Sequence, residues 1–183
     1  SLEQNPSGEW HNDDALSLQA ASTIRKDYAT HNPVAFPQAI APHIAAELNH
    51  IPLTLGNLLQ QCQTGLEQVA DLHLIEGAGG WLVPLNNEHT LADFAQQLNY
   101  DIVLVVGMKL GCINHALLTQ QLILASKLNF VGWVANHIDP EMSEQETNFA
   151  YLKSHLQAPC LGRIPFSPNR SPKDMIQHIT LPN

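Results

Sequence analysis

The sequence has few basic residues. Its 183 residues contain 8 Lys and Arg against 17 Asp and Glu, for a formal net charge of −9. Non-specific binding to nucleic acid requires a positive surface that neutralises phosphates, so this balance argues against a nucleic-acid partner. The acidity does not indicate which small molecule the protein handles.

Other absences exclude further classes of protein. No apolar run reaches the roughly 18 residues of a membrane-spanning helix, so we expect no membrane association. The first residues lack the basic and apolar segments of a signal peptide. The three cysteines, Cys62, Cys112 and Cys160, have no paired spacing, so we expect free thiols in a reducing cytoplasm. A length of 183 residues predicts one domain, residues 1–183, with a buried core.

Nucleotide and metal signatures are missing as well. No G-x-x-x-x-G-K-[ST] phosphate loop occurs, and the glycine run at 77–80 does not fit G-x-G-x-x-G. An enzyme that handles ATP on an α/β fold normally needs such a loop, because its amides surround the phosphates and its Lys neutralises them. The metal-binding spacings C-x-x-C and H-x-x-x-H are also absent.

What the sequence contains is an alternation of helical and strand patterns. Helices are predicted after Asn12, after Ala41, and over 54–69, 90–98, 114–127, 144–155 and 173–179, with Ser143 as an N-cap. Apolar runs predict strands at 72–75, 102–106, 130–136 and 158–165, whereas residues 1–11 have the composition of a loop. This order predicts an α/β fold with a parallel sheet flanked by helices, in which 102–106 is central because both its faces are apolar.

The segment from Leu72 to Leu85 is the first candidate site. Its apolar run ends in one carboxylate, Glu76, and a glycine-rich turn follows. Ligands bind at the carboxyl ends of parallel strands, where an acid can hold a metal ion against a phosphate. The alternative is a tight turn whose glutamate is only solvated.

Four further residues or loops are weaker candidates. Asp14 fits a helix cap as well as a ligand. The loop 109–114 enters a helix whose first amides could hold a carboxylate or phosphate together with Lys109, and an ordinary loop is the alternative. Asn136 ends a strand, where its amide can pair with a base or cap a helix. Cys112 has no recognisable His or Asp partner, which favours a structural thiol over a nucleophile.

Five stretches resemble dethiobiotin synthases. They are NDDAL at 12–16, EGAGGW at 76–81, VVGMKLGCINHA at 105–116, GWVAN at 132–136 and GRIP at 162–165. They occur in the family's order and cover nearly the whole chain, and KLGCINH at 109–115 is highly specific. Related P-loop amidotransferases of cobalamin synthesis share the fold but not this run.

The resemblance implies a homodimeric, P-loop NTPase-like α/β enzyme of biotin synthesis. Such a cyclo-ligase uses ATP and Mg²⁺ to join CO₂ to 7,8-diaminononanoate and to close the ureido ring of dethiobiotin. A carbamate forms on one amine and ATP phosphorylates it. The other amine then attacks the carbamic-phosphoric anhydride with loss of phosphate.

The resemblance also assigns residues to these roles. Asp14 and Glu76 match Mg²⁺ ligands that face the ATP phosphates. The matched ATP-binding positions are Asp14, Glu76, Gly77, Ala78, Gly79, Asn136, His137, Pro165, Phe166 and Ser167. The loop that receives the substrate carboxylate across the dimer interface is matched by Lys109, Leu110, Gly111, Cys112 and Asn114.

The sequence departs from the family pattern before Asp14. The family's first strand, its phosphate loop with Lys and Thr, and a second strand with a catalytic Lys precede that position, and this sequence starts after them. We therefore expect no catalytic residue to be retained and the chain to be inactive or nearly so, because it lacks the cations that stabilise phosphoryl transfer. Exposed sheet edges are expected to make it poorly soluble.

Two alternatives remain open at this point. The first is a non-catalytic remnant that dimerises through 109–114 and holds a carboxylate. The second is a related P-loop amidotransferase-type synthetase, against which the lack of a glutaminase domain argues.

Overall fold

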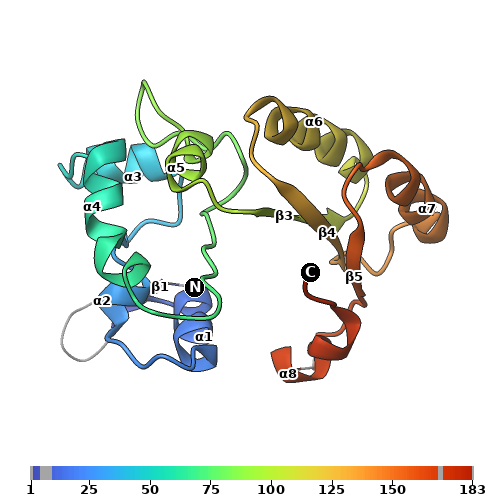
Figure 1. Ribbon diagram of the computed structural model, residues 1–183, viewed down its shortest axis with the longest axis horizontal. Helices are drawn as coiled ribbons and strands as arrows, with labels where there is room; N and C mark the ends of the chain where they lie inside the picture. The colour runs from blue at the N-terminus through green and yellow to red at the C-terminus, as the bar shows by residue number, and fades with distance from the viewer. Residues whose placement is uncertain (1, 5–9, 169–170, 183) are drawn as a thin grey trace. The chain divides into compact units, whose positions relative to one another are not determined.

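A computed structural model describes residues 2–4, 10–168 and 171–182. The chain divides into two compact units, residues 1–97 and residues 98–183 (Figure 1). The boundary falls at the end of α5 (Leu91–Leu98), so all strands of the parallel sheet belong to unit 2. The single domain stays a prediction. Within the described ranges, no helix has the length and apolar content needed to cross a membrane.

Unit 2 is built on a three-stranded parallel sheet of order β3-β4-β5. Its strands are β3 (Ile102–Met108), β4 (Phe130–His137) and β5 (Cys160–Ile164). Helix α6 (Cys112–Ala125) connects β3 to β4, and helix α7 (Gln145–His155) connects β4 to β5. Parallel neighbours require such crossover connections. The predicted α/β architecture is thereby confirmed, and it is consistent with a P-loop NTPase-like fold.

One face of this sheet is covered by α6 and α7. Side chains alternate between faces along a strand, and the buried cluster takes every second residue from β3 and β4. It consists of Val106, Met108, Cys112, Ala116, Trp133, Ala135, Leu152 and Leu156. Trp133 is fully buried, and its ring centroid lies 5.7 Å from that of Phe149 on α7. Removing this apolar surface from water is the main force that holds the helices on the sheet.

The other face of β3 is exposed. Val103 and Val105 are 41 % and 60 % exposed, and no described strand pairs with β3 on its outer side. Among the described residues β3 is therefore an edge strand, and its predicted central place is wrong. An apolar pattern reports which faces a strand is able to bury, not which neighbours it has. A free apolar edge of this kind favours association with other chains.

Unit 1 consists mainly of helices. They are α1 (Asp13–Ala21), α2 (Tyr28–His31), α3 (Pro42–Leu48), α4 (Leu55–Leu66) and α5. Ahead of them, β1 (Leu2–Gln4) pairs antiparallel with β2 (Trp10–Asn12), where the composition predicted only a loop. The pairing is three residues long, too short for a recognisable alternation of apolar and polar residues.

The predicted helix starts in unit 1 are confirmed by hydrogen bonds. The side chains of Asn12 and Thr54 accept hydrogen bonds from the first amides of α1 and α4. At α5, the carboxylate of Asp93 accepts from the amide and the hydroxyl of Thr90, at 2.6 and 2.8 Å. These bonds lower the pKa of the Asp93 carboxyl below its ordinary value. Residues that cap a helix act locally, which is why the sequence alone placed these ends.

The predicted strand at Leu72–Ile75 is wrong. The segment has no strand partner among the described residues, and Leu72 and Leu74 are exposed. The ring of His73 instead contacts the carbonyl oxygen of Gln68 at 2.9 Å. A strand forms only where a neighbour pairs its backbone groups, and an apolar run does not reveal whether that neighbour is present.

The last two helix predictions differ in outcome. Helix α7 follows Glu144, whose φ is +55°, and no side chain caps its start, so the predicted Ser143 cap is wrong. The predicted C-terminal helix is present as α8 (Pro172–Met175) and the 3₁₀-helix η1 (Ile176–His178), with a capping box between Ser171 and Asp174. After η1 the chain packs against β5, where the amide of Thr180 donates to the carbonyl of Leu161 at 2.7 Å.

Gly162 permits this contact between β5 and the C-terminal segment. A Cβ atom at Gly162 would lie 2.2 Å from the carbonyl oxygen of His178 and 2.9 Å from the Cα of Ile179. These are backbone atoms, so the segment would have to move away. We expect Gly162→Ala to lower the free energy of unfolding by about 1–3 kcal/mol, the usual range for overpacking. Urea denaturation followed by circular dichroism measures this change.

The matched control is Gly56→Ala in α4. Nothing lies within 4 Å of a Cβ atom at Gly56. Because Ala is a better helix former than Gly, this variant should be neutral or more stable by up to about 1 kcal/mol. Equal destabilisation by both substitutions would refute the steric argument.

Candidate functional site

The carboxyl ends of β4 and β5 border a cavity of about 340 Å³. Its lining residues are Asn136, His137, Ile138, Ile164, Pro165, Phe166, Ser167, Pro168 and Met175. Five of them are predicted ATP-binding residues, namely Asn136, His137, Pro165, Phe166 and Ser167. The structure therefore brings this part of the predicted site together, at the edge of the sheet where ligands of α/β folds bind.

The cavity wall is mainly apolar, with a few polar groups. Such walls bury a flat ring system, and the polar groups fix its orientation. Asn136 is half-buried and offers an amide that both donates and accepts hydrogen bonds, which is the pattern needed to pair with the edge of an adenine. Phe166 is exposed, so its ring is accessible to a stacking partner.

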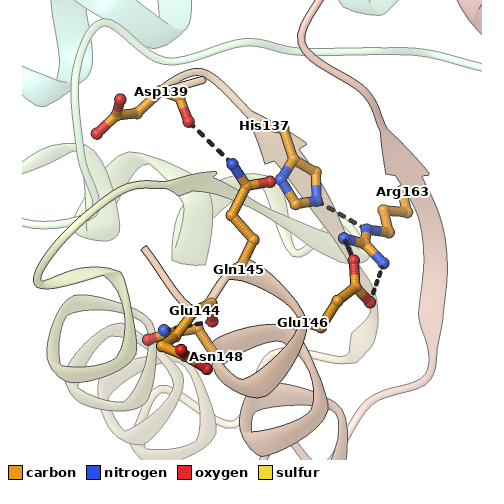
Figure 2. Close-up of polar contacts among 7 residues, drawn as sticks. All are labelled: His137, Asp139, Glu144, Gln145, Glu146, Asn148 and Arg163. Atoms are coloured by element: carbon orange, nitrogen blue, oxygen red, sulfur yellow. Dashed lines mark hydrogen bonds and ion pairs between the residues drawn. The ribbon is translucent and has the colours of Figure 1, made fainter. Parts of the chain in front are cut away.

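A polar network next to the cavity joins β4, β5 and α7. The Nε of Arg163 donates to the Nε2 of His137 at 2.8 Å, and its Nη1 donates to Glu146 Oε2 at 2.8 Å (Figure 2). The second carboxylate oxygen of Glu146 accepts from Nη2, so the ion pair is bidentate. The guanidinium carbon lies 4.7 Å from the centroid of the Phe149 ring. Gln145 lies beside the imidazole and donates to the carbonyl of Asp139 at 3.4 Å.

This network favours an uncharged His137. Burial lowers the pKa of His137 below its ordinary value of 6.5, and the positive charge of Arg163 lowers it further. Gln145 and Glu146 act in the opposite direction and do not reverse the shift. The same ion pair lowers the pKa of Glu146 and raises that of Arg163, so both remain charged at neutral pH.

Sequence reasoning assigned no role to Arg163, Gln145 or Glu146. The stretch GRIP at 162–165 contributed to the family resemblance, but its arginine carried no recognisable motif. Glu146 lies 17 residues before Arg163, on the helix that precedes β5. Such a contact depends on how α7 packs on the sheet, and no local pattern encodes it.

Glu76 lies in an exposed turn of unit 1. Gly79 has a φ of +89°, a conformation that favours glycine. The amide of Val83 donates to the carbonyl of Gly80 at 3.1 Å, and the carbonyl of Val83 accepts from Leu91 at 2.9 Å. The turn after Glu76 is thereby closed against the start of α5, although the strand predicted before it is absent.

Asp14 is exposed in the first turn of α1. The cap of this helix is Asn12, whose Oδ1 accepts from the amides of Asp14 and Ala15 at 2.8 and 3.1 Å. The hydroxyl of Tyr28 accepts from the amide of Asn12 at 2.8 Å, and the Tyr28 ring stacks on His11. Since Asn12 serves as the cap, the carboxylate of Asp14 is not needed for that purpose.

Asp14 and Glu76 both belong to unit 1. Among the described residues, no group of three or more His, Cys, Asp and Glu side chains gathers as a metal site would require. Mg²⁺ is often held by one or two carboxylates together with water and substrate phosphates, so two acids suit its chemistry. Their role as a pair stays a prediction.

The predicted substrate loop leads from β3 into α6. Gly111, with a φ of +90°, occupies the N-cap position and has no side chain to cap the helix. Lys109, Leu110 and Asn114 are exposed, whereas Cys112 is buried in the core cluster. An uncapped helix start beside a lysine favours an anion. The Cys112 thiol packs as a structural group, so a ligand would meet only its backbone.

Comparison with known proteins identifies the family. A family model described as an AAA domain matches residues 4–174. The ATP-dependent dethiobiotin synthetase BioD of Xanthomonas campestris pv. campestris (strain 8004) is 48 % identical over 173 residues, which are 94 % of this chain and 77 % of the relative. The chain belongs to the dethiobiotin synthetase family. The resemblance seen in the five sequence stretches is thereby confirmed.

Two further dethiobiotin synthetases show the range of similarity. The protein of Cellvibrio japonicus (strain Ueda107) is 53 % identical over 154 residues, or 84 % of this chain and 67 % of the relative. That of Pseudomonas aeruginosa (strain UCBPP-PA14) is 45 % identical over 170 residues, or 93 % of this chain and 75 % of the relative. The similarity to dethiobiotin synthetases thus extends through both units.

The Asn12 cap generates a prediction about Asp14. Asn12→Ala removes the acceptor for the amides of Asp14 and Ala15, so the first turn of α1 should fray at a cost of about 1 kcal/mol. Hydrogen exchange should then accelerate at these two amides. Asn12→Asp keeps the acceptor and should exchange as the native chain does. Unchanged exchange in the alanine variant would rule out the capping role.

Proposed function

We propose that this chain takes part in the reaction for which its relatives are named, the ATP-dependent synthesis of dethiobiotin. The observation that carries the proposal is 48 % identity to a dethiobiotin synthetase over 94 % of the chain. The cavity lined by five of the predicted ATP-binding residues supports it independently. Relatives named as dethiobiotin synthetases also argue against the amidotransferase-type alternative.

The proposed substrates are 7,8-diaminononanoate, CO₂ and ATP. One amine adds to CO₂ and loses a proton, which gives a carbamate. A carbamate oxygen attacks the γ-phosphoryl group, so ADP leaves and a carbamic-phosphoric anhydride forms. The second amine attacks the anhydride carbonyl, the ureido ring closes, and inorganic phosphate leaves. The product belongs to biotin biosynthesis.

The cavity of unit 2 is the proposed place of the adenine ring. Asn136 would pair with the edge of the base, and Phe166 would stack on its face. Pro165 and Ser167 line the same cavity from the segment after β5. The half-buried position of Asn136 suits this role, because a hydrogen bond shielded from water discriminates well between bases.

The acids of unit 1 are the proposed metal ligands. Asp14 and Glu76 are exposed carboxylates, and hard oxygen donors fit Mg²⁺. Bound Mg²⁺ would neutralise negative charge on the ATP phosphates. Residues 77–79 would lie beside the triphosphate, where the small side chains of the turn leave the backbone accessible.

Lys109 and the uncapped start of α6 are the proposed site of the substrate carboxylate, with Leu110, Gly111, Cys112 and Asn114 as further contacts. We also propose a homodimer in the cytoplasm. The three cysteines are free thiols, as expected in a reducing compartment.

The function is tested by a chimera with a relative. This chain replaces the matching 173 residues of the Xanthomonas campestris synthetase, which are 77 % of that protein. With 7,8-diaminononanoate, bicarbonate, ATP and MgCl₂, the chimera should form dethiobiotin, detected by mass spectrometry. A folded chimera that makes none would overturn the proposed function.

A polypeptide with only these 183 residues should behave differently. Its sequence contains no G-x-x-x-x-G-K-[ST] loop, whose amides and lysine stabilise the charge that develops in phosphoryl transfer. We expect no phosphate release above background in the presence of ATP and the diamine. Release that depends on both compounds would show that other groups in the chain replace the loop.

The metal ligands are tested within the chimera. Glu76→Gln keeps the size of the side chain but removes the negative charge that would hold Mg²⁺. Removal of one group that stabilises charge in a transition state, such as an oxyanion-hole donor, commonly lowers kcat by about a hundredfold. We expect a loss of this order for Glu76→Gln and for Asp14→Asn, partly restored by excess MgCl₂. Glu88→Gln, which changes another exposed glutamate of unit 1, should leave the rate unchanged. Equal rates in all variants would exclude both assignments.

A second candidate function is binding of a carboxylate without turnover. The exposed, uncapped start of α6 beside Lys109 favours it. Calorimetry of the 183-residue chain with 7,8-diaminononanoate, with and without ATP, separates the two functions. Binding of the diamine without any affinity for the nucleotide would support this candidate.

A further inference from the structure

The cavity proposed for adenine and the Arg163 network share one residue, His137. We infer that Arg163 is a positioning residue for this cavity: its Nε holds His137 as the neutral tautomer protonated on Nδ1, and thereby fixes the end of β4 that presents Asn136. The inference rests on the proposed function, because the cavity is taken as a nucleotide site.

The tautomer of His137 follows from its hydrogen bond with Arg163, in which the arginine is the donor. Arg163 donates its Nε–H to the Nε2 of His137 at 2.8 Å. An arginine side chain does not lose its proton in a protein, so Nε2 must supply a lone pair. A neutral imidazole with an unprotonated Nε2 carries its proton on Nδ1. Protonation of Nε2 would place two N–H groups against each other and break the bond.

The guanidinium is itself held in one orientation. Glu146 binds both of its Nη atoms, and the Phe149 ring lies 4.7 Å from its central carbon. Its positive charge is therefore already compensated by a carboxylate on α7. This arrangement suits a group that orients a neighbour, and it argues against Arg163 as a ligand of the ATP phosphates.

The register of β4 and β5 places Arg163 next to the wall of the cavity. Arg163 pairs with Ala135 and Ile164 pairs with Asn136, so the arginine and the cavity wall lie on adjacent positions of β5. Successive side chains of a strand point to opposite faces. His137, only 6 % exposed, is thus anchored on the face covered by α7, and the side chain of Asn136 projects from the other face.

Groups on β5, α7 and β3 lie around His137 and differ in their effect on its pKa. From β5 comes the positive charge of Arg163, and from α7 come the amide of Gln145 and the carboxylate of Glu146. In β3 the register partner is Met108, which does not titrate. Apart from burial, Arg163 is the group that opposes protonation. Without it, the ring should take up a proton closer to its ordinary pKa of 6.5.

The test uses the 183-residue chain with ¹⁵N-labelled histidine. Long-range ¹H–¹⁵N spectra report which ring nitrogen of His137 carries the proton. Adenosine is the ligand, since it has no phosphate that titrates, and its affinity is measured from about pH 5.5 to about pH 8. Arg163→Lys keeps the charge but lacks the Nε donor, and Arg163→Gln removes the charge. Arg25→Lys, at an exposed arginine of unit 1, is the matched control.

We expect the native chain to show the Nδ1–H tautomer and to bind adenosine with an affinity that depends less on pH than that of Arg163→Gln. Both Arg163 variants should bind adenosine about tenfold more weakly, the effect of losing one hydrogen bond from a charged group. In Arg163→Gln the affinity should also fall towards the acid end of the range, because His137 takes up a proton more readily without the positive charge of Arg163. Glu146→Gln removes the carboxylate that holds both Nη atoms, and it should weaken binding less than either Arg163 variant because the Nε donor to His137 remains. Arg25→Lys should match the native chain.

The outcomes separate the inference from the proposed function. An Nε2–H tautomer in the native chain overturns the inference, whatever adenosine does. If the folded Arg163 variants keep the native affinity and pH profile, the positioning role of Arg163 is also overturned, but the proposed nucleotide site is not. If the folded native chain does not bind adenosine, the proposed base site is wrong and the positioning role falls with it, although the tautomer is still measured.

Discussion

The packing of β4 between two parallel neighbours is the constraint on which the described site depends. Its side chains on one face, Trp133 and Ala135, bury against α6 and α7. The position of the strand's carboxyl end is then determined by a core of close-packed apolar groups, which tolerates little displacement. Asn136 and His137 follow directly on this buried segment, so the cavity takes its geometry from the core.

The polar network next to the cavity orients the side chain of His137 and adds little to the stability of the fold. Glu146 is largely exposed, and an exposed ion pair contributes little to the free energy of folding. What the network supplies is orientation, since the planar guanidinium of Arg163 matches a carboxylate at one end and an imidazole nitrogen at the other. Apolar packing and the polar network thus lie on the same face of β4, and together they fix the end of the strand that carries Asn136 and His137.

The parts of the structure that could be predicted from the sequence are the local ones. Asn12, Thr54 and Thr90 mark helix starts through contacts within a few residues, and the apolar runs of β3 and β4 are continuous enough to identify alone. Leu72–Ile75 failed because pairing is decided by a distant partner. The same limit applies to the site. Asn136 was a weak candidate from its place at a strand end, and Phe166 followed from the family resemblance. The bond between Arg163 and His137 follows only from the packed sheet and helix.

The left-handed backbone of Glu144 determines where the residues after it lie. A non-glycine residue with φ near +55° costs roughly 1 kcal/mol or more, which the surrounding fold must offset. In return, the helix starts at one defined residue, because Glu144 also accepts hydrogen bonds from Thr147 and Asn148. The rotational phase of α7 is then set at its first residue, and a shift by a single residue would turn Gln145 and Glu146 by about 100° away from the sheet. The network next to the cavity is thus aligned by a bend of the main chain outside it.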